Sequence, residues 1–281
     1  MSIGSPIVDL LPGERPHLGG AATNVAVTAA RLGAPAAICG AVGSDAEGGW
    51  LRERLAAEGV ATQWLLTSGA TEIVEVAFEG AEPSFAAHGE RTSQLVEALE
   101  AHLPDAVRAA GMLYATSNCL VEARAAALVE EACAAVRADG GTVVLDVNLR
   151  SRRWVAGTDP RACVERLLRH ATVVKANVHE ATWLTDEADP AAAAEALHAA
   201  GPELALVSRG PQGAVARGLV SLELPSPPAE VRSTLGAGDV LVGTLMAWLW
   251  EGDGTPAAAE RAVREALDAA ARSTTREGAL T

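Results

Sequence analysis

The sequence predicts an α/β protein with a doubly wound, mostly parallel sheet and helices on both of its faces. Short apolar runs rich in β-branched residues alternate with longer alanine-rich runs of helical periodicity, and this alternation is typical of a parallel sheet. The hydrophobic fraction of 49% and the mean hydropathy of +0.17 fit a globular core. Because no repeat, linker or second core is evident, we expect one domain over residues 1–281.

The elements are expected where apolar periodicity changes from a period of two to a period of 3.6. The predicted strands are Ala36–Val42, Ile73–Phe78, Met112–Thr116, Thr142–Val147, Thr172–Ala176, Leu204–Val207 and Ala214–Leu222. The predicted helices are Ala22–Leu32, Ala46–Glu58, Glu122–Ala138, Pro160–His170, Pro190–Ala199, Asp239–Trp250 and Thr255–Ser273. Residues 71–90 depart from the pattern, because they mix charges with an alternating strand, and we expect a small β flap there.

Composition excludes several classes of partner. The net charge of −14 argues against nucleic acid, which calls for a basic face. The apolar runs are too short to span a bilayer, and no basic region followed by an apolar one marks a secretory signal. We therefore expect no membrane partner and a cytoplasmic location. The scattered cysteines 39, 119, 133 and 163 are expected to be small buried residues.

Lys175 is the only lysine in the chain. A Walker A loop needs a lysine directly after a glycine and before Ser or Thr, whereas Lys175 lies between Val174 and Ala176. The protein-kinase glycine loop and catalytic-loop signature are also absent from the sequence. If the protein binds a nucleotide, it therefore does so through a different motif.

Polar residues follow several of the predicted strands, at the edge where ligands bind in open α/β sheets. They are Ser117 and Asn118, Asn148 and Arg150, Asn177 and Glu180, and Ser208, Arg209 and Gly210. Because the carboxyl ends of parallel strands share one edge of the sheet, we expect these groups to converge on one site.

The stretch STLGAGDVLVGTL begins a helix with two glycines and a carboxylate, in the order Gly236, Ala237, Gly238 and Asp239. Small residues leave the first backbone N–H groups uncovered, and with the helix dipole these donors make an anion site. Asp239 alone would suit an ordinary helix cap. A carboxylate beside an anion site also suits phosphoryl transfer to a hydroxyl, with Asp239 accepting the hydroxyl proton.

A second glycine turn, GGAATNVAVTAARLG, repeats this layout near the amino terminus. Gly19 and Gly20 precede a helix whose first turn contains Asn24. The Asn24 amide is suited to hydrogen bonding with a polyol, and an ordinary polar residue at a helix start is the alternative. Asp9 is expected either to cap a short strand or to bind substrate hydroxyls.

Asn177 and Glu180, in NVHE, have the i, i+3 spacing that places two side chains on one helix face. That face suits metal-bound water next to phosphates, because Mg²⁺ prefers oxygen ligands and keeps its waters. The same pair also fits a capping box, with Asn as the N-cap and Glu three residues later. Both interpretations stay open from these residues alone.

Together these segments resemble the ribokinase-like sugar kinases, also called the phosphofructokinase-B family. The resemblance rests on GGAATNVAVTAARLGAPAAICGAVGSDAEGGWL and STLGAGDVLVGTL, with LDVNLRSRRW and VVKANVHEATWLT between them in the family's order and spacing. It covers essentially the whole chain. LDVNLRSRRW is most similar to the branch that holds fructokinases and 2-keto-3-deoxygluconate kinases.

The resemblance implies a ribokinase-like fold with a short β lid, and it implies a role for each motif residue. Asp239 would be the catalytic base, with Gly236, Ala237 and Gly238 as the anion hole. The other implied roles are sugar binding by Asp9, Gly19, Gly20 and Asn24, magnesium and phosphate organisation by Asn177 and Glu180, nucleotide contact by Ser208, Arg209, Gly210 and Gly213, and contact of Arg150 with phosphates or a substrate carboxylate.

The chain departs from the family where relatives usually carry Asp-Thr-Thr before Gly-Ala-Gly-Asp. Ser233, Thr234 and Leu235 stand there instead. In relatives that aspartate helps to form a monovalent-cation site, so potassium activation is not expected here. Leu235 also removes a hydroxyl near the phosphate path. In addition, only three residues precede Gly4, where relatives carry a full first strand.

The resemblance implies ATP- and Mg²⁺-dependent phosphorylation of a primary hydroxyl of a small sugar or sugar acid, of the fructose or 2-keto-3-deoxygluconate type. Two alternatives stay open. One is a nucleoside kinase of the same fold, and the other is a catalytically weakened protein that binds sugar or nucleotide, which the departures at 233 and 235 favour. The sequence also leaves a homodimer open, because an unpaired strand at the edge of the flap would tend to pair with another chain.

Overall fold

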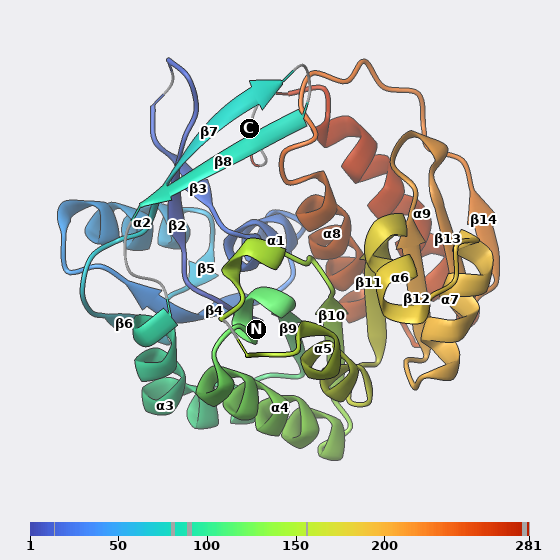
Figure 1. Ribbon diagram of the computed structural model, residues 1–281, viewed down its shortest axis with the longest axis horizontal. Coiled ribbons are helices and arrows are strands. Elements are labelled where there is room, and N and C mark those ends of the chain that lie inside the picture. Colours follow the sequence, from blue (N-terminus) through green and yellow to red (C-terminus); the bar gives the residue numbers. More distant parts are fainter. Residues whose placement is uncertain (14, 80–81, 89–91, 156, 277–279, 281) are drawn as a thin grey trace.

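A large sheet forms the centre of the computed structural model, which describes residues 1–13, 15–79, 82–88, 92–155, 157–276 and 280 (Figure 1). Its strand order is β14-β13-β12-β11-β10-β9-β1-β4-β5, and β6 also pairs with β4. The strands are β1 (Ser2–Ile3), β4 (Ala36–Val42), β5 (Val60–Ala61), β6 (Leu65–Thr67), β9 (Met112–Thr116), β10 (Thr142–Asp146), β11 (Val173–Asn177), β12 (Leu204–Ser208), β13 (Ala214–Gly218) and β14 (Leu222–Leu224). All pairs are parallel except β12–β13 and β13–β14.

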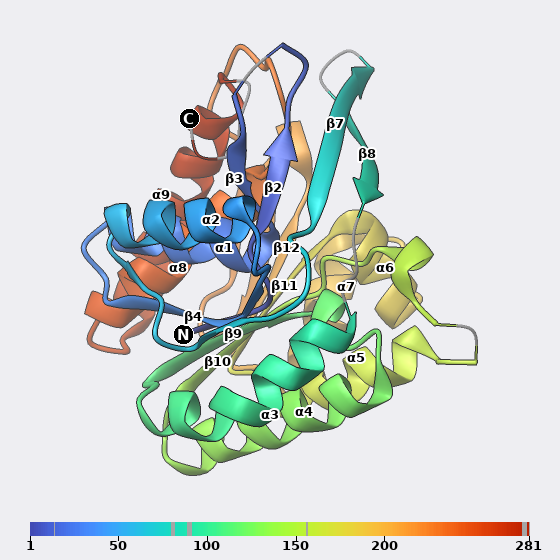
Figure 2. The ribbon, with the colours of Figure 1, turned by 90° about the vertical axis from the view of Figure 1, so that its left-hand side faces the viewer.

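Helices cover both faces of this sheet, as the sequence predicts (Figure 2). One face packs against α3 (Thr92–Arg108), α4 (Ala123–Ala138), α5 (Pro160–Leu168), α6 (Val178–Thr185) and α7 (Pro190–Ala199). The other face packs against α1 (Ala21–Arg31), α2 (Ala46–Ala57), α8 (Ala237–Glu251) and α9 (Pro256–Ser273). Because side chains alternate along a strand, every second residue of the central strands points into each apolar layer.

A separate small sheet, with the order β3-β2-β7-β8, stands at one edge of the large one (Figure 2). It consists of β2 (Ile7–Leu10), β3 (His17–Gly19), β7 (Ile73–Glu79) and β8 (Glu82–His88). The expected flap over residues 71–90 is therefore only half of this sheet, since β2 and β3 come from the first twenty residues. Residues 80–81 and 89–90 of that prediction lie outside the described residues.

The predicted elements differ from the structure in several places. The single strand expected over Ala214–Leu222 is a pair of antiparallel strands, because Gly218 has a φ of 103° and turns the chain. The prediction also lacks two helices, α3 and α6, and the short strands β1, β2, β3, β5 and β6. Helix α3 contains Pro104, a residue that usually ends a helix. The remaining predicted strands and helices are confirmed within a few residues at their ends.

Within the described ranges, no helix combines the length and the apolar character needed to cross a membrane. The four cysteines are buried and free, as expected.

Candidate active site

Helix α8 begins at the glycine-rich motif, with Gly236 as its N-cap at a φ of 69°. Glycine adopts this left-handed conformation without strain. Ala237 donates its N–H to the carbonyl of Thr234 at 3.2 Å. The N–H groups of Gly238 and Asp239 have no acceptor within the helix, and Gly236 has no side chain to cap them. Such donors, together with the helix dipole, are suited to an anion, and an anion site at this turn stays a prediction of the sequence.

Residues 233–238 are called the α8 turn below. Two of them, Ser233 and Leu235, hold this turn in place. Ser233 is buried; its Oγ accepts a hydrogen bond from the Leu235 N–H at 3.1 Å, and its own N–H donates to the Thr274 carbonyl at 3.1 Å. Leu235 packs against an apolar cluster of the small sheet that includes Leu11 and Val74. Ser233 thus ties the turn to the end of α9, and Leu235 joins it to the small sheet.

Asp239 lies in the first turn of α8 and meets Asn24 from the first turn of α1. The Asn24 Nδ2 donates to the Asp239 Oδ2 at 2.8 Å. Burial raises the pKa of Asp239 above the usual value for aspartate, while the Asn24 hydrogen bond and the charges of Lys175 and Arg150 oppose that rise. The structure therefore brings two predicted site residues, 215 positions apart in the chain, into direct contact.

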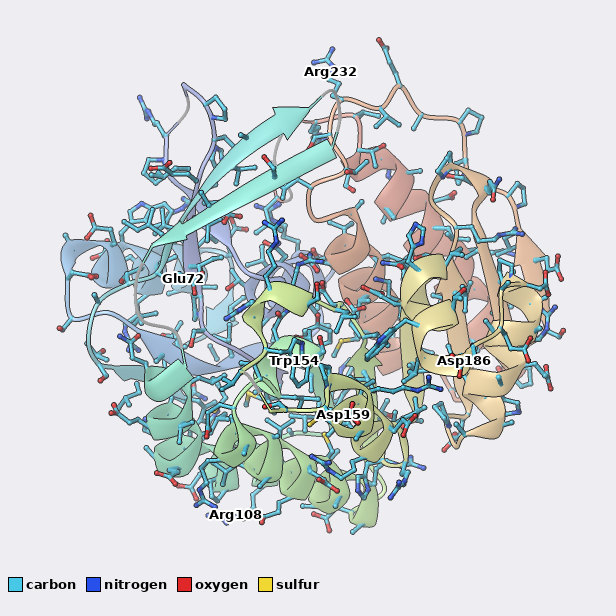
Figure 3. The ribbon with its side chains drawn as sticks, viewed as in Figure 1. Glu72, Arg108, Trp154, Asp159, Asp186 and Arg232 are labelled. Carbon is cyan, nitrogen blue, oxygen red and sulfur yellow. The ribbon has the colours of Figure 1, made fainter. Side chains whose placement is uncertain are left out.

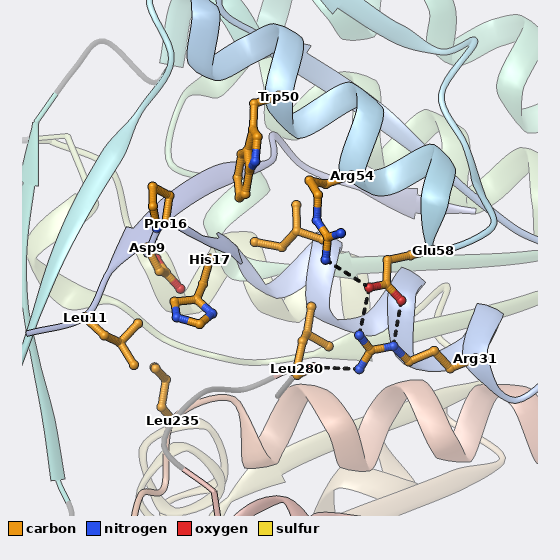
Figure 4. A pocket seen from close by; sticks show the side chains of 11 residues that line it. Asp9, Leu11, Pro16, His17, Arg31, Trp50, Arg54, Glu58, Leu235 and Leu280 are labelled. Carbon is orange, nitrogen blue, oxygen red and sulfur yellow. Dashed lines mark hydrogen bonds and ion pairs between the residues drawn. The ribbon is translucent and has the colours of Figure 1, made fainter. Parts of the chain in front are cut away.

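The α1 turn (residues 19–20) carries a carboxylate instead of an anion site. Asp9 is buried in β2, and a Cβ on Gly19 would collide with its carboxyl group. Gly20, with a φ of 92°, is the N-cap of α1. Asp9 also lines a cavity of about 80 Å³, together with His17, Trp50 and other side chains (Figure 4). Asn24 and Asp239 do not line this cavity.

The capping box predicted for Asn177 and Glu180 is present. The Asn177 Oδ1 accepts the Glu180 N–H at 2.9 Å, and the Glu180 Oε2 accepts the Asn177 N–H at 2.9 Å. The Glu180 Oε1 also accepts the N–H of Leu149 at 3.0 Å. Glu180 is thus a buried carboxylate fixed by two backbone donors at the carboxyl edge of the sheet.

Residues 208–213, which are expected to lie along the nucleotide, form a tight loop after β12. Ser208 pairs with Asn177 in the register of β11 and β12, so the two predicted phosphate-side segments are neighbours. The Arg209 N–H donates to the Gly213 carbonyl at 2.7 Å. Gly213 has a φ of 89°, and a Cβ there would collide with the Leu224 carbonyl. Gly210 begins the short 3-10 helix between them.

Arg150 lies on the exposed side of the site, after β10. Within the described residues its guanidinium forms no hydrogen bond or ion pair, and its charge lowers the pKa of the buried Asp239 carboxyl. Arg153, three residues later, donates to the Asn118 Oδ1 at 3.4 Å. Trp154 packs against the core on the side of α3–α7 (Figure 3). Arg150 is therefore an exposed cation of this segment whose charge reaches Asp239.

Sequence reasoning missed one charged pair beneath the site. The Lys175 Nζ donates to the Asp146 Oδ1 at 3.0 Å, and both side chains are buried. For both Asp146 and Lys175, the signal in the sequence is a charged residue within an otherwise apolar strand. The pairing itself depends on the register of β10 and β11, which aligns Asp146 with Lys175.

Comparison with known proteins identifies the family. Residues 11–281 match the family described as pfkB family carbohydrate kinase. The chain belongs to this family. It is therefore a sugar kinase, and the resemblance noted in its motifs is confirmed.

The relatives include enzymes of two substrate types. A fructokinase of Klebsiella pneumoniae is 34% identical over 260 residues, covering 88% of this chain and 83% of that protein. The crystal structure of fructokinase from Vibrio cholerae O395 with fructose, ADP and calcium ion superposes with a TM-score of 0.87 at 27% identity, covering 99% of this chain and 93% of that one. Aminoimidazole riboside kinase from Salmonella enterica, with aminoimidazole riboside and an ATP analog, gives 0.86 at 27% identity and covers 99% and 94%.

Proposed function

We propose that this sugar kinase transfers the γ-phosphoryl group of ATP to a primary hydroxyl of a small sugar or sugar acid, of the fructose or 2-keto-3-deoxygluconate type. The observation that carries the proposal is the position of the Asp239 carboxylate. It lies at the uncapped start of α8 and accepts a hydrogen bond from Asn24 at 2.8 Å. The similarity to fructokinases supports the choice of sugar.

In the proposed reaction, Asp239 accepts the proton of the sugar hydroxyl. The hydroxyl oxygen forms a bond to the γ-phosphorus, and the bond between that phosphorus and the bridging oxygen of ADP breaks, so that ADP leaves with the electron pair. The N–H groups at the start of α8 hold the oxygens of the moving group. Because burial raises the pKa of Asp239, this carboxylate is a stronger base than an exposed aspartate.

We assign the sugar to the side of the α1 turn, where Asp9, Gly19, Gly20 and Asn24 lie. Carboxylate and amide oxygens accept hydrogen bonds from sugar hydroxyls. The small sheet would act as a lid that excludes water from the reacting groups. In this proposal the whole chain works as one kinase domain, and the small sheet is its lid.

We assign the nucleotide to the loop of Ser208, Arg209, Gly210 and Gly213, with Arg150 near the phosphates. Asn177 and Glu180 fit a magnesium ion held through water, because both Glu180 oxygens already accept backbone N–H groups and each keeps a further lone pair. Bound magnesium would offset the negative charge of the phosphates. With Ser233 hydrogen-bonded within its own turn, we propose that no potassium is required.

One observation favours a nucleoside kinase as the second candidate. Trp50 and His17 line the cavity beside Asp9, and a flat aromatic side chain there is suited to stacking on a base (Figure 4). The similarity to aminoimidazole riboside kinase supports including this substrate class.

The test is ADP release measured over fructose, 2-keto-3-deoxygluconate, ribose and aminoimidazole riboside, in sodium and in potassium salts. We expect a ketose or sugar acid to give the highest kcat/KM, with equal rates in both salts. Asp239→Asn should lower kcat about a thousandfold, the scale of a lost general base, with sugar affinity nearly intact. Retention of most of the rate by Asp239→Asn would show that the base is assigned wrongly. Binding of a sugar without turnover by the wild type would favour a kinase-derived binding protein.

We also propose a cytoplasmic enzyme, since its phosphoryl donor is ATP, and a homodimer. The dimer proposal is supported by β8, which is an edge strand of the small sheet within the described residues.

A further inference from the structure

A buried ion pair lies in the large sheet directly below the start of α8. Lys175 in β11 and Asp146 in β10 are register partners, and their side chains point toward the layer of α1 and α8. The Lys175 Nζ donates to the Asp146 Oδ1 at 3.0 Å, and the exposed fractions of the two residues are 6% and 0%. The one lysine of the chain is therefore buried and held by a carboxylate.

The ammonium group of this pair reaches the α8 turn. A Cβ placed on Gly238 would lie 3.1 Å from the Lys175 Nζ. The ammonium thus lies against the backbone whose N–H groups form the anion site. Its charge also acts on the carboxylates of Asp239 and Glu180.

Stability alone gives little reason for such a pair. Removing two charges from water is costly, and apolar residues of similar volume often serve a core equally well or better. The Asp146 Oδ2 and the Tyr114 Oη are also buried without a hydrogen-bond partner in the described part of the chain. A buried charged pair with an oxygen left unpaired is more common at functional sites than in a purely structural core.

The proposed reaction creates a need for a cation at this place. It brings the negatively charged phosphoryl group of ATP next to the Asp239 carboxylate at one helix start, so the two anions repel each other. Arg150 is a second cation near Asp239, but it is exposed and its charge is screened by water. A cation fixed in the low-dielectric interior acts more strongly over the same distance.

We propose that Lys175 is a positioning residue for phosphoryl transfer, which places a fixed positive charge under the α8 turn and is itself held there by Asp146. It acts through the turn and does not touch the substrate. This inference rests on the proposed role of the α8 turn and of Asp239.

The test compares Lys175→Met with Leu206→Met, which alters the register partner of Lys175 on β12 without changing charge. With the sugar that is turned over fastest, we expect Lys175→Met to lower kcat about a hundredfold, the scale of a lost preorganised electrostatic group. Both KM values should stay within about threefold, because ground-state binding is largely unaffected. Leu206→Met should retain the wild-type rate. A Lys175→Met enzyme with the wild-type kcat would overturn the proposal.

Two further variants separate charge from folding. Asp146→Asn keeps the ammonium, so we expect its kcat to be at least about tenfold above that of Lys175→Met. The double variant Lys175→Met, Asp146→Asn leaves no unpaired charge, so it should fold stably and remain as slow as Lys175→Met. Recovery of the wild-type rate in the double variant, or an equal loss in Asp146→Asn, would indicate a structural role only.

The affinity for a transition-state mimic gives a readout that a structural role would not change. By calorimetry, Lys175→Met should bind ADP like the wild type but bind ADP with aluminium fluoride about a hundredfold more weakly. Equal loss for both ligands would contradict the proposal. The proposed function fails separately, through an active Asp239→Asn enzyme, so the two failures are distinguishable.

Discussion

The α1 turn and the α8 turn are built alike, yet they lie next to opposite charges. Each contains a glycine N-cap with positive φ, at 92° for Gly20 and 69° for Gly236, and neither helix has a side-chain cap. The two helices pack together, and their first turns meet through the hydrogen bond from Asn24 to Asp239. A glycine N-cap with positive φ therefore begins both of the helices that meet at this site.

The difference in charge comes from a side chain on the strand next to each turn. A Cβ on Gly19 would meet the Asp9 carboxylate, whereas a Cβ on Gly238 would meet the Lys175 ammonium. A carboxylate accepts hydrogen bonds and suits the hydroxyls of a sugar, while a cation beside free N–H groups suits a phosphoryl group. In the proposed function, one side chain from a neighbouring strand thus sets which ligand chemistry each glycine turn suits.

The largest effect is expected from filling the two turns with methyl groups. Gly19→Ala forces the Asp9 carboxyl group to move, so sugar KM should rise about a hundredfold, the loss expected of a misplaced binding group. Gly238→Ala meets only the flexible end of Lys175, so kcat should fall about tenfold with a smaller change in sugar KM. Steady-state kinetics in sugar and in ATP separate the two effects.

Gly49 offers a matched control for both substitutions. It lies in α2, and a Cβ there would meet nothing within 4 Å. Gly49→Ala should leave the kinetics unchanged and raise the free energy of unfolding by about 0.5–1 kcal/mol, because alanine favours a helix. If Gly19→Ala lowered only kcat and Gly238→Ala raised only sugar KM, the division between the turns would be the reverse of the one inferred here.

The sequence predicts both turns and names Asp9, but it does not predict that Asp9 and Lys175 lie against them. Glycines before an amphipathic helix are a local signal, and so is the capping box of Asn177 and Glu180, which the structure contains. The contact of Lys175 with Asp146 depends on strand register across 29 residues, and no local pattern reports that register. Leu235 shows the same limit, since its packing against the small sheet appears only once both sheets are folded.

A smaller effect is expected where the first turn of α1 meets the first turn of α8. Burial raises the pKa of Asp239, and the Asn24 hydrogen bond is the largest effect that opposes the rise. Asn24→Leu removes that donor, so the pKa of Asp239 should rise further, because the ionised carboxylate loses a hydrogen bond. Asp239 must be ionised to act as the base, so activity is lost as pH falls through its pKa. The acid limb of the kcat–pH profile should therefore move to higher pH, and a shift to lower pH would rule out Asp239 as the titrating base.

The smallest effect concerns a buried hydroxyl on each of the two helices. Thr23 in α1 and Thr244 in α8 are buried, and their Oγ1 atoms lack a hydrogen-bond partner among the described residues. Valine has nearly the same shape and no polar group, so Thr23→Val and Thr244→Val should each raise the free energy of unfolding by up to about 1 kcal/mol. Urea denaturation measures the change.

Thr185 provides the contrast for this pair. Its hydroxyl donates to the Ala181 carbonyl at 2.8 Å and accepts the Glu187 N–H at 3.2 Å. Thr185→Val should therefore lower the free energy of unfolding by about 1 kcal/mol. If Thr23→Val destabilised the protein as much as Thr185→Val while Thr244→Val did not, then the Thr23 hydroxyl would have a partner such as bound water. The α1 turn would in that case be the more hydrated of the two, as a site for sugar hydroxyls should be.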